Sequence, residues 1–190
     1  MLLEKDLEKQ ILEILGDEEA FHVMNKEDAN RILKEQATRI LKEHFTQEAQ
    51  DKLKDVVVRY RYSPIAQKEC IRASVSLSGK SIFVVGKQLF LDTDLVHEYV
   101  HIADMKGMIP RYHFSEAYDE MYGLENENTQ DDIDKIEKIL RIYTAENRES
   151  ELIARISELI SVDSLSVPQE MLMVYSRVLK NASLVCERVW

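Results

Sequence analysis

The sequence predicts an α+β domain, because the spacing of its apolar residues changes twice along the chain. A helical spacing runs through residues 1–54, a two-residue alternation follows in residues 56–85, and a helical spacing returns at residue 93. We therefore expect an N-terminal helical segment over residues 1–54, a small and mainly antiparallel sheet, one central helix and a C-terminal helical bundle. A chain of 190 residues with 45% hydrophobic residues fits a single domain over residues 1–190.

The charge and cysteine content exclude several classes of partner. The net charge of −10 repels phosphate backbones and anionic lipids, so we expect neither nucleic acid nor a membrane as a partner. Two cysteines, Cys70 and Cys186, suit a reducing compartment, and no basic segment leads into an apolar signal sequence. The expected location is cytoplasmic, and signal-less delivery into a host or packaging in a virion also fits. The sequence makes no prediction of the oligomeric state.

Three helices are expected before the first strand. Apolar residues at helical spacing predict a helix over residues 2–15. A second helix begins after the N-cap residue Asn25 and continues to about Phe45, with its lysines and glutamates facing solvent. Thr46 is placed to cap a third, short helix that ends near Lys54.

Runs of alternating apolar and polar residues predict strands over residues 56–62, 71–77 and 81–85. In the second run the apolar residues up to Leu77 fall on one face, and a Ser-Gly-Lys turn leads into the third run as a hairpin. A further strand is expected between residues 86 and 94. Its edge would bind an extended peptide by backbone pairing, and an ordinary core strand there is an equal alternative.

The central helix, expected over residues 93–106 with Gly107 and Pro110 ending it, contains an H-E-x-x-H motif. His97 and His101 are four residues apart, which places them about 40° from each other on one helical face, so both imidazoles can reach one ion. Glu98 lies in the same polar sector, the position from which metallopeptidases hold a metal-bound water. A surface helix with polar residues facing water is the simpler alternative, but apolar residues flank the motif on both sides.

A catalytic zinc ion has three protein ligands, so two histidines need a third. The downstream candidates are His113, Glu116, Asp119, Glu120 and Glu151, and spacing alone does not choose among them. The elements expected after the central helix are a loop over 111–114, a short helix capped by Ser115 and ending at Tyr122, a polar linker over 126–132, helices over 133–143 and 152–160, and a last helix from Pro168 to Cys186.

Two segments resemble a known family. The H-E-x-x-H-x-x-D segment Leu95 to Asp104 and the E-x-x-A-R-x-x-E segment that begins at Glu151 are similar to helices of gluzincin-type, zincin-like peptidase domains found in phage, plasmid and toxin proteins. The resemblance implies a zincin-like fold in which His97, His101 and Glu151 bind Zn²⁺ and Glu98 is the general base.

The sequence departs from thermolysin-like enzymes four residues after the glutamate ligand, where Arg155 replaces the aspartate that supports a ligand histidine. Asp104 is expected to supply that hydrogen bond instead, and an ion pair between Asp104 and Arg155 that ties two helices together is a compatible alternative.

The expected function is zinc-dependent hydrolysis of peptide bonds in a protein or peptide substrate, in which zinc lowers the pKa of a water molecule and Glu98 accepts its proton. The candidate donors for the developing oxyanion are Tyr112, His113, Tyr118 and Tyr143, and the sequence does not choose among them. The alternative is a non-enzymatic binding or virion-associated protein with a zinc-stabilised or vestigial site. Glu98 favours the enzyme, because structural zinc needs no base.

Overall fold

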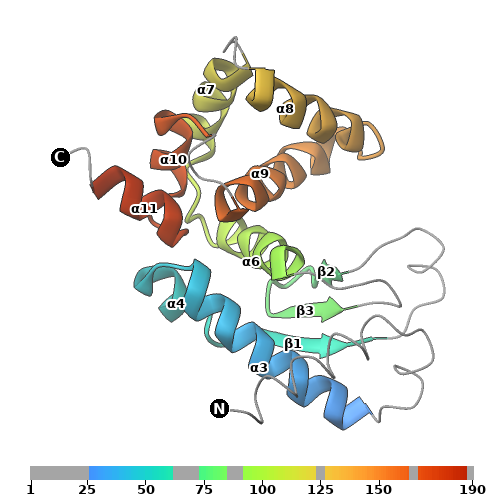
Figure 1. The fold of residues 1–190 in the computed structure, drawn as a ribbon. Coiled ribbons are helices and arrows are strands. Elements are labelled where there is room, and N and C mark those ends of the chain that lie inside the picture. The colour runs from blue at the N-terminus through green and yellow to red at the C-terminus, as the bar shows by residue number, and fades with distance from the viewer. Residues whose placement is uncertain (1–25, 62–72, 85–91, 123–126, 163–166, 188–190) are drawn as a thin grey trace.

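The computed structural model describes residues 26–61, 73–84, 92–122, 127–162 and 167–187. It is an α+β fold that is mostly helical and includes a three-stranded sheet (Figure 1). The elements are α3 (Lys26–His44), α4 (Gln47–Leu53), β1 (Val57–Tyr60), β2 (Ala73–Val75), β3 (Ser81–Val84), α6 (Asp92–Met105), α7 (Arg111–Tyr122), α8 (Glu127–Leu140), α9 (Ala145–Val162), α10 (Gln169–Tyr175) and α11 (Lys180–Glu187). The expected helix over 2–15, residues 86–91 of the expected fourth strand, and Cys70 lie outside the described residues.

The two predicted helices that precede the sheet are confirmed. Acidic residues in the first turn of α3 and basic residues in its last turn complement the helix dipole. Thr46 is the N-cap of α4, where its hydroxyl accepts a hydrogen bond from the backbone N–H of Ala49 at 3.2 Å. The same hydroxyl donates to the carbonyl of Arg177 at 2.6 Å, so the cap also joins α4 to the C-terminal helices.

The sheet has the strand order β1-β3-β2 and is mixed, so the expected mainly antiparallel sheet is only half correct. β2 and β3 form the predicted antiparallel hairpin, with Val75 opposite Ile82, whereas β1 runs parallel to β3, with Val57 opposite Ser81. The difference arises because β1 pairs with β3 rather than with its sequence neighbour β2. The chain between β1 and β3 therefore returns to the same end of the sheet, which makes the two strands parallel.

The hairpin turn begins earlier than predicted. Leu77, expected on the core face of a strand, lies in the turn and is fully exposed. Gly79 has a φ of +63°, a backbone conformation that favours glycine, and a Cβ at this position would lie 3.4 Å from the side chain of Met105. The turn thus packs closely against the end of α6.

Helix α6 runs through the middle of the molecule, with α9 on one side and α3, α4 and β2 on the other (Figure 1). Its bounds differ from the prediction by one residue at each end. Gly107 ends it with a φ of +68°, donating to the carbonyl of Asp104 at 2.8 Å, while the N–H of Met108 donates to that of Ala103 at 2.9 Å. These two hydrogen bonds form a Schellman motif, which ends the helix as the glycine predicts.

Two polar segments that we expected to be irregular are helical. Residues 111–114 form the first turn of α7 after Pro110, so Ser115 is an internal residue whose hydroxyl donates to the carbonyl of Arg111 at 3.2 Å. The expected linker over 126–132 is largely the start of α8. The first turns of α8 have no apolar residue before Ile133, so their composition resembles that of a linker.

The expected last helix is two helices, α10 and α11, separated by residues 176–179. The break places backbone groups against the start of α4. The N–H of Thr46 donates to the carbonyl of Val178 at 2.9 Å, and Phe45 and Leu179 form an isolated β-bridge. In a continuous helix the carbonyl of Val178 would accept a hydrogen bond from within the helix. Its pairing with the distant Thr46 instead accounts for the break between α10 and α11.

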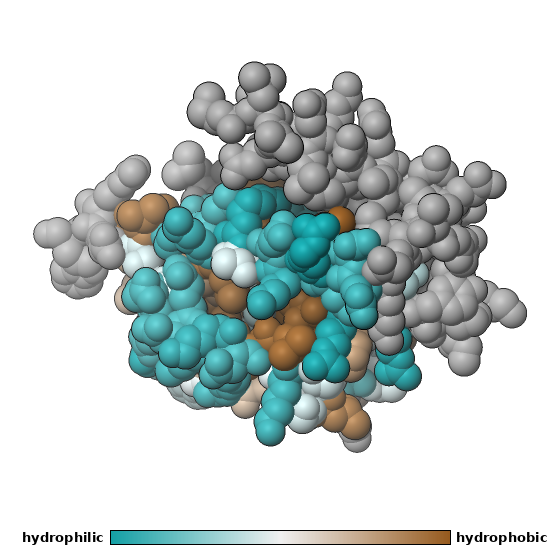
Figure 2. Space-filling view, turned by 90° about the horizontal axis from the view of Figure 1, so that it is seen from below, coloured by the Kyte–Doolittle hydropathy of each residue, from teal (hydrophilic) through white to brown (hydrophobic). Residues whose placement is uncertain are grey.

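The face that includes α3 is mostly hydrophilic. Seen from below, teal side chains surround a hollow in which hydrophobic residues are visible (Figure 2). Both arginines of α3 have acidic neighbours: Arg31 lies near Asp28, and Arg39 pairs with Glu43 and Asp92. Among the described helices, none is long and apolar enough to cross a membrane.

Candidate metal centre

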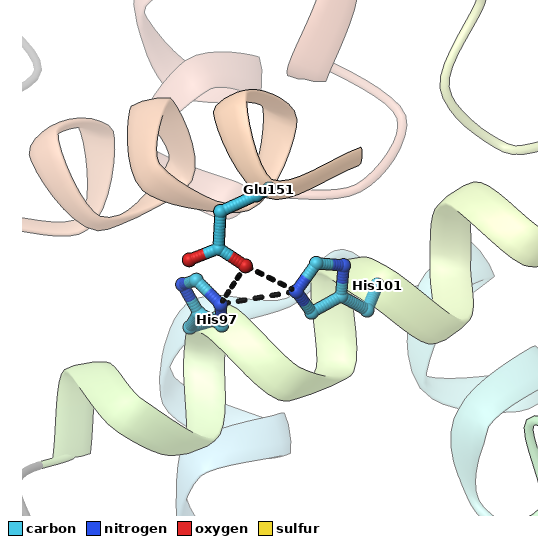
Figure 3. A group of neighbouring side chains, drawn as sticks. All are labelled: His97, His101 and Glu151. Carbon is cyan, nitrogen blue, oxygen red and sulfur yellow. Dashed lines mark hydrogen bonds and ion pairs between the residues drawn. The ribbon is translucent and has the colours of Figure 1, made fainter. Parts of the chain in front are cut away.

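Three side chains from two helices converge on one point. His97 and His101 project from α6 and Glu151 from the facing α9 (Figure 3). The two Nε2 atoms are 3.0 Å apart, and Oε2 of Glu151 lies 3.5 Å from Nε2 of His97 and 3.4 Å from Nε2 of His101. His97 and Glu151 are buried and His101 is half-buried, so the three donor atoms share a largely enclosed position.

This triangle fits a metal ion of the size and geometry of zinc. Zinc holds nitrogen and oxygen ligands at about 2.0–2.1 Å in a tetrahedron, which separates neighbouring donor atoms by about 3.3 Å. The observed separations of 3.0, 3.4 and 3.5 Å bracket that value. Two imidazoles and one carboxylate are also among the donor sets that catalytic zinc uses.

The other ring nitrogen of His97 is held by a carboxylate. Nδ1 of His97 lies 2.6 Å from Oε1 of Glu158 on α9. An ionised carboxylate only accepts hydrogen bonds, so Nδ1 carries the proton and donates it. Nε2 is then directed toward Glu151 and His101. Metal-binding histidines in proteins are commonly oriented in this way.

His101 is held through a hydroxyl. Its Nδ1 lies 3.1 Å from Oγ of Ser150, which donates to Oδ2 of Asp104 at 3.3 Å. Arg111 binds both oxygens of Asp104, at 3.0 and 2.6 Å, so this carboxylate is fixed as an acceptor. The hydrogen bond that we expected Asp104 to make with a histidine is therefore replaced by an indirect contact with His101 through Ser150. Its ion pair is with Arg111 and not with Arg155.

Arg155 contacts both glutamates of α9 that face the histidines. Its Nε donates to Oε1 of Glu151 at 3.0 Å, and its Nη1 donates to Oε1 of Glu158 at 3.0 Å. All three residues are on one face of α9, at i, i+4 and i+7. Arg155 therefore leaves Oε2 of Glu151 directed toward the histidines and keeps the two carboxylates at a fixed separation.

The close contacts change the protonation of the metal-free site. Burial alone would lower the pKa of His97, but hydrogen bonds to Glu151 and Glu158 outweigh it and raise the pKa to about 9. Burial would raise the pKa of Glu151, but the close contacts with the imidazoles of His101 and His97 hold this pKa well below its usual range. Without a metal, the site holds a proton in the place of the cation.

Glu98 is buried beside this cluster, with 7% of its surface exposed. Within the described part of the chain, no group donates a hydrogen bond to its carboxylate. Burial raises its pKa, and the charges of His97 and His101 offset this only in part. A buried carboxylate with a raised pKa next to three candidate metal ligands is suited to accept a proton from a water molecule.

Comparisons with known proteins return no match at a significant level, whether with family models, curated proteins or solved structures. What the site can do is therefore inferred from its own atoms.

The remaining candidate ligands do not join the cluster. Glu116 lies on the exposed face of α7, near the exposed side chains of His113, at 3.4 Å, and Tyr112. Asp119 and Glu120 belong to the same helix and are outside the group of donor atoms. Of the five candidates, only Glu151 comes within reach of both histidines.

The four candidate oxyanion donors differ in how close they lie to the metal-ligand cluster. Tyr112 and His113 are exposed on α7, and the hydroxyl of Tyr118 donates to Glu137 at 2.8 Å. Tyr143 lies near the cluster: burial raises its pKa, and the negative charge of Glu151 adds to this effect while Arg155 opposes it.

Three supporting residues had no role assigned from the sequence: Glu158, Ser150 and Arg111. Glu158 had a detectable signal, because it is seven residues after Glu151 and so shares its helical face. Ser150 precedes a candidate ligand but has no distinctive spacing, and Arg111 was expected in a loop. Their roles depend on how α7 and α9 pack against α6, which the periodicity of each helix does not specify.

Proposed function

We propose that this protein is a zinc-dependent, gluzincin-type metallopeptidase that hydrolyses peptide bonds of a protein substrate. The observation that supports this best is the triangle of donor atoms of His97, His101 and Glu151. In both histidines Nδ1, the ring nitrogen outside the triangle, is already held by a protein acceptor. Helices α6 and α9 are already held together by packing, so a metal ion is not needed to join them. A preformed set of ligands at this place therefore suits a catalytic ion better than a structural ion.

The chain's own residues divide the work. His97, His101 and Glu151 would hold the ion, while Glu158 and Asp104 orient the histidines. When bound, zinc lowers the pKa of a coordinated water toward ~7 and polarises a carbonyl. Glu98 accepts the proton of the attacking water and later delivers it to the leaving amine. Burial of Glu98 keeps competing hydrogen-bond donors away and favours this exchange.

Metal analysis and one isosteric substitution test the proposal. Protein purified without added metal should contain close to one zinc per chain and should cleave members of a library of quenched fluorescent peptides. Glu98→Gln keeps the shape but removes the basic oxygen, so zinc should remain bound while cleavage is lost. Glu120→Gln, on exposed α7, is the matched control and should behave as the wild type.

Two results would contradict the peptidase. Full cleavage by a clean Glu98→Gln protein would remove Glu98 as the base. Stoichiometric zinc without cleavage of any peptide or unfolded protein by the wild type would favour the binding or virion-associated alternative.

A further inference from the structure

Two histidines of the candidate site are supported by chemically different partners. His97 donates directly to a carboxylate at 2.6 Å, whereas His101 lies 3.1 Å from the neutral hydroxyl of Ser150. The carboxylate of Asp104 lies one hydrogen bond further away. A hydroxyl between these two groups can accept a hydrogen bond from one of them while it donates a hydrogen bond to the other.

We propose that Ser150 is a positioning residue that transmits the fixed orientation of Asp104 to His101 and thereby selects the ring tautomer with the proton on Nδ1. The inference rests on the proposed function, because its consequence is the readiness of His101 to bind zinc through Nε2.

The direction of each hydrogen bond follows from Arg111. Its guanidinium donates to both carboxylate oxygens of Asp104, so both oxygens act as hydrogen-bond acceptors. Ser150 has one hydroxyl proton and must donate it to Asp104. Its oxygen is then left to accept, so Nδ1 of His101 is the donor, and Nε2, which faces His97 and Glu151, is the nitrogen left to bind zinc.

The chain of contacts extends to the surface. The side chain of Asp104 is 1% exposed, but that of Arg111 is 49% exposed and also pairs with Glu149 at 2.9 Å. Arg111 begins α7 and Glu149 precedes Ser150 on α9, so the relay joins three helices at the metal centre. Packing among α6, α7 and α9 thus determines the tautomer of one ligand.

Variants at position 150 that differ only in hydrogen bonding test this. Ser150→Thr keeps the hydroxyl, and Ser150→Val has nearly the same shape as threonine without it. We expect zinc affinity, measured by competition with a chromophoric chelator, to fall about 10-fold in Ser150→Val and in Ser150→Ala. Ser150→Thr should restore it to near the wild-type value. Ser161→Ala, which removes another half-buried α9 hydroxyl outside the relay, should leave it unchanged.

A second measurement needs no metal. Nitrogen-15 NMR of the histidine rings in zinc-free protein should show the Nδ1–H tautomer for His101 in the wild type and a larger share of Nε2–H in Ser150→Val. The cobalt-substituted absorption spectrum should change in Ser150→Val but not in Ser161→Ala.

The possible failures are distinguishable. Equal zinc affinity in Ser150→Thr and Ser150→Val, or an Nε2–H tautomer in the wild type, would overturn the relay and leave the peptidase proposal standing. Equal losses in Ser150→Thr and Ser150→Val would assign the effect to packing and also overturn it. Absence of zinc binding in the wild type would overturn the proposed function and the relay together.

Discussion

Zinc binding to this site should release a proton from His97, and the affinity for zinc should therefore rise steeply with pH. Hydrogen bonds to Glu151 and Glu158 raise the pKa of this histidine to about 9 in the metal-free protein. Because pH 7 is about two units below this pKa, about 99% of the rings are protonated at pH 7. Only the neutral ring binds zinc, so the apparent affinity at pH 7 is about 100-fold below its alkaline limit.

Calorimetric titration with zinc at pH 7 and 8, in buffers with different ionisation enthalpies, measures the protons released. Close to one proton per zinc should come from His97, with the affinity rising about tenfold per pH unit up to about pH 9. Glu158→Gln removes one of the two carboxylates that hold the proton, so it should lower the pKa of His97 and shift this rise to lower pH. An affinity that is flat between pH 7 and 8, without proton release, would refute the reasoning.

The stability of the zinc-free protein has a matching pH dependence. The folded-state pKa of His97, about 9, is above the unfolded value of about 6.5, so the protonated ring stabilises the fold. This contribution is complete below pH 6.5 and is lost as the pH rises through 9. It amounts to about 3 kcal/mol by linkage. Urea unfolding at pH 6 and 9 checks the sign, and a zinc-free protein that is more stable at pH 9 would contradict it.

Three further predictions concern single side chains. Glu151→Ala should weaken zinc binding by ~10-fold or more in a competition titration, while Glu120→Ala leaves it unchanged; the reverse order would move the ligand to α7. Arg111→Ala leaves the carboxylate of Asp104 without its charged partner and should lower the free energy of unfolding in urea by about 2 kcal/mol, and a loss below 0.5 kcal/mol would show that water replaces the arginine. Gly107→Ala should cost about 1 kcal/mol because of its positive φ, and an unchanged melting temperature would contradict this.

The sequence by itself determined the helix that carries the site. The H-E-x-x-H spacing places His97, Glu98 and His101 correctly, because the helical repeat is a local property of the backbone. Its end was equally local, since Gly107 supplies the conformation that a Schellman motif requires. The cap at Thr46 and the β2–β3 hairpin were predictable for the same reason: their signals lie within a few residues of one another.

Only the tertiary structure decided which distant groups meet. The parallel pairing of β1 with β3 and the break between α10 and α11 depend on backbone partners far away in sequence, so no local pattern predicts them. The same holds for the support of the histidines. Nothing in the sequence of α6 indicates that Glu158 holds His97, or that Ser150 stands between Asp104 and His101. Those contacts are set by how α9 packs on α6, because a helix's periodicity fixes which face a side chain occupies but not the rotation or register of the helix that faces it.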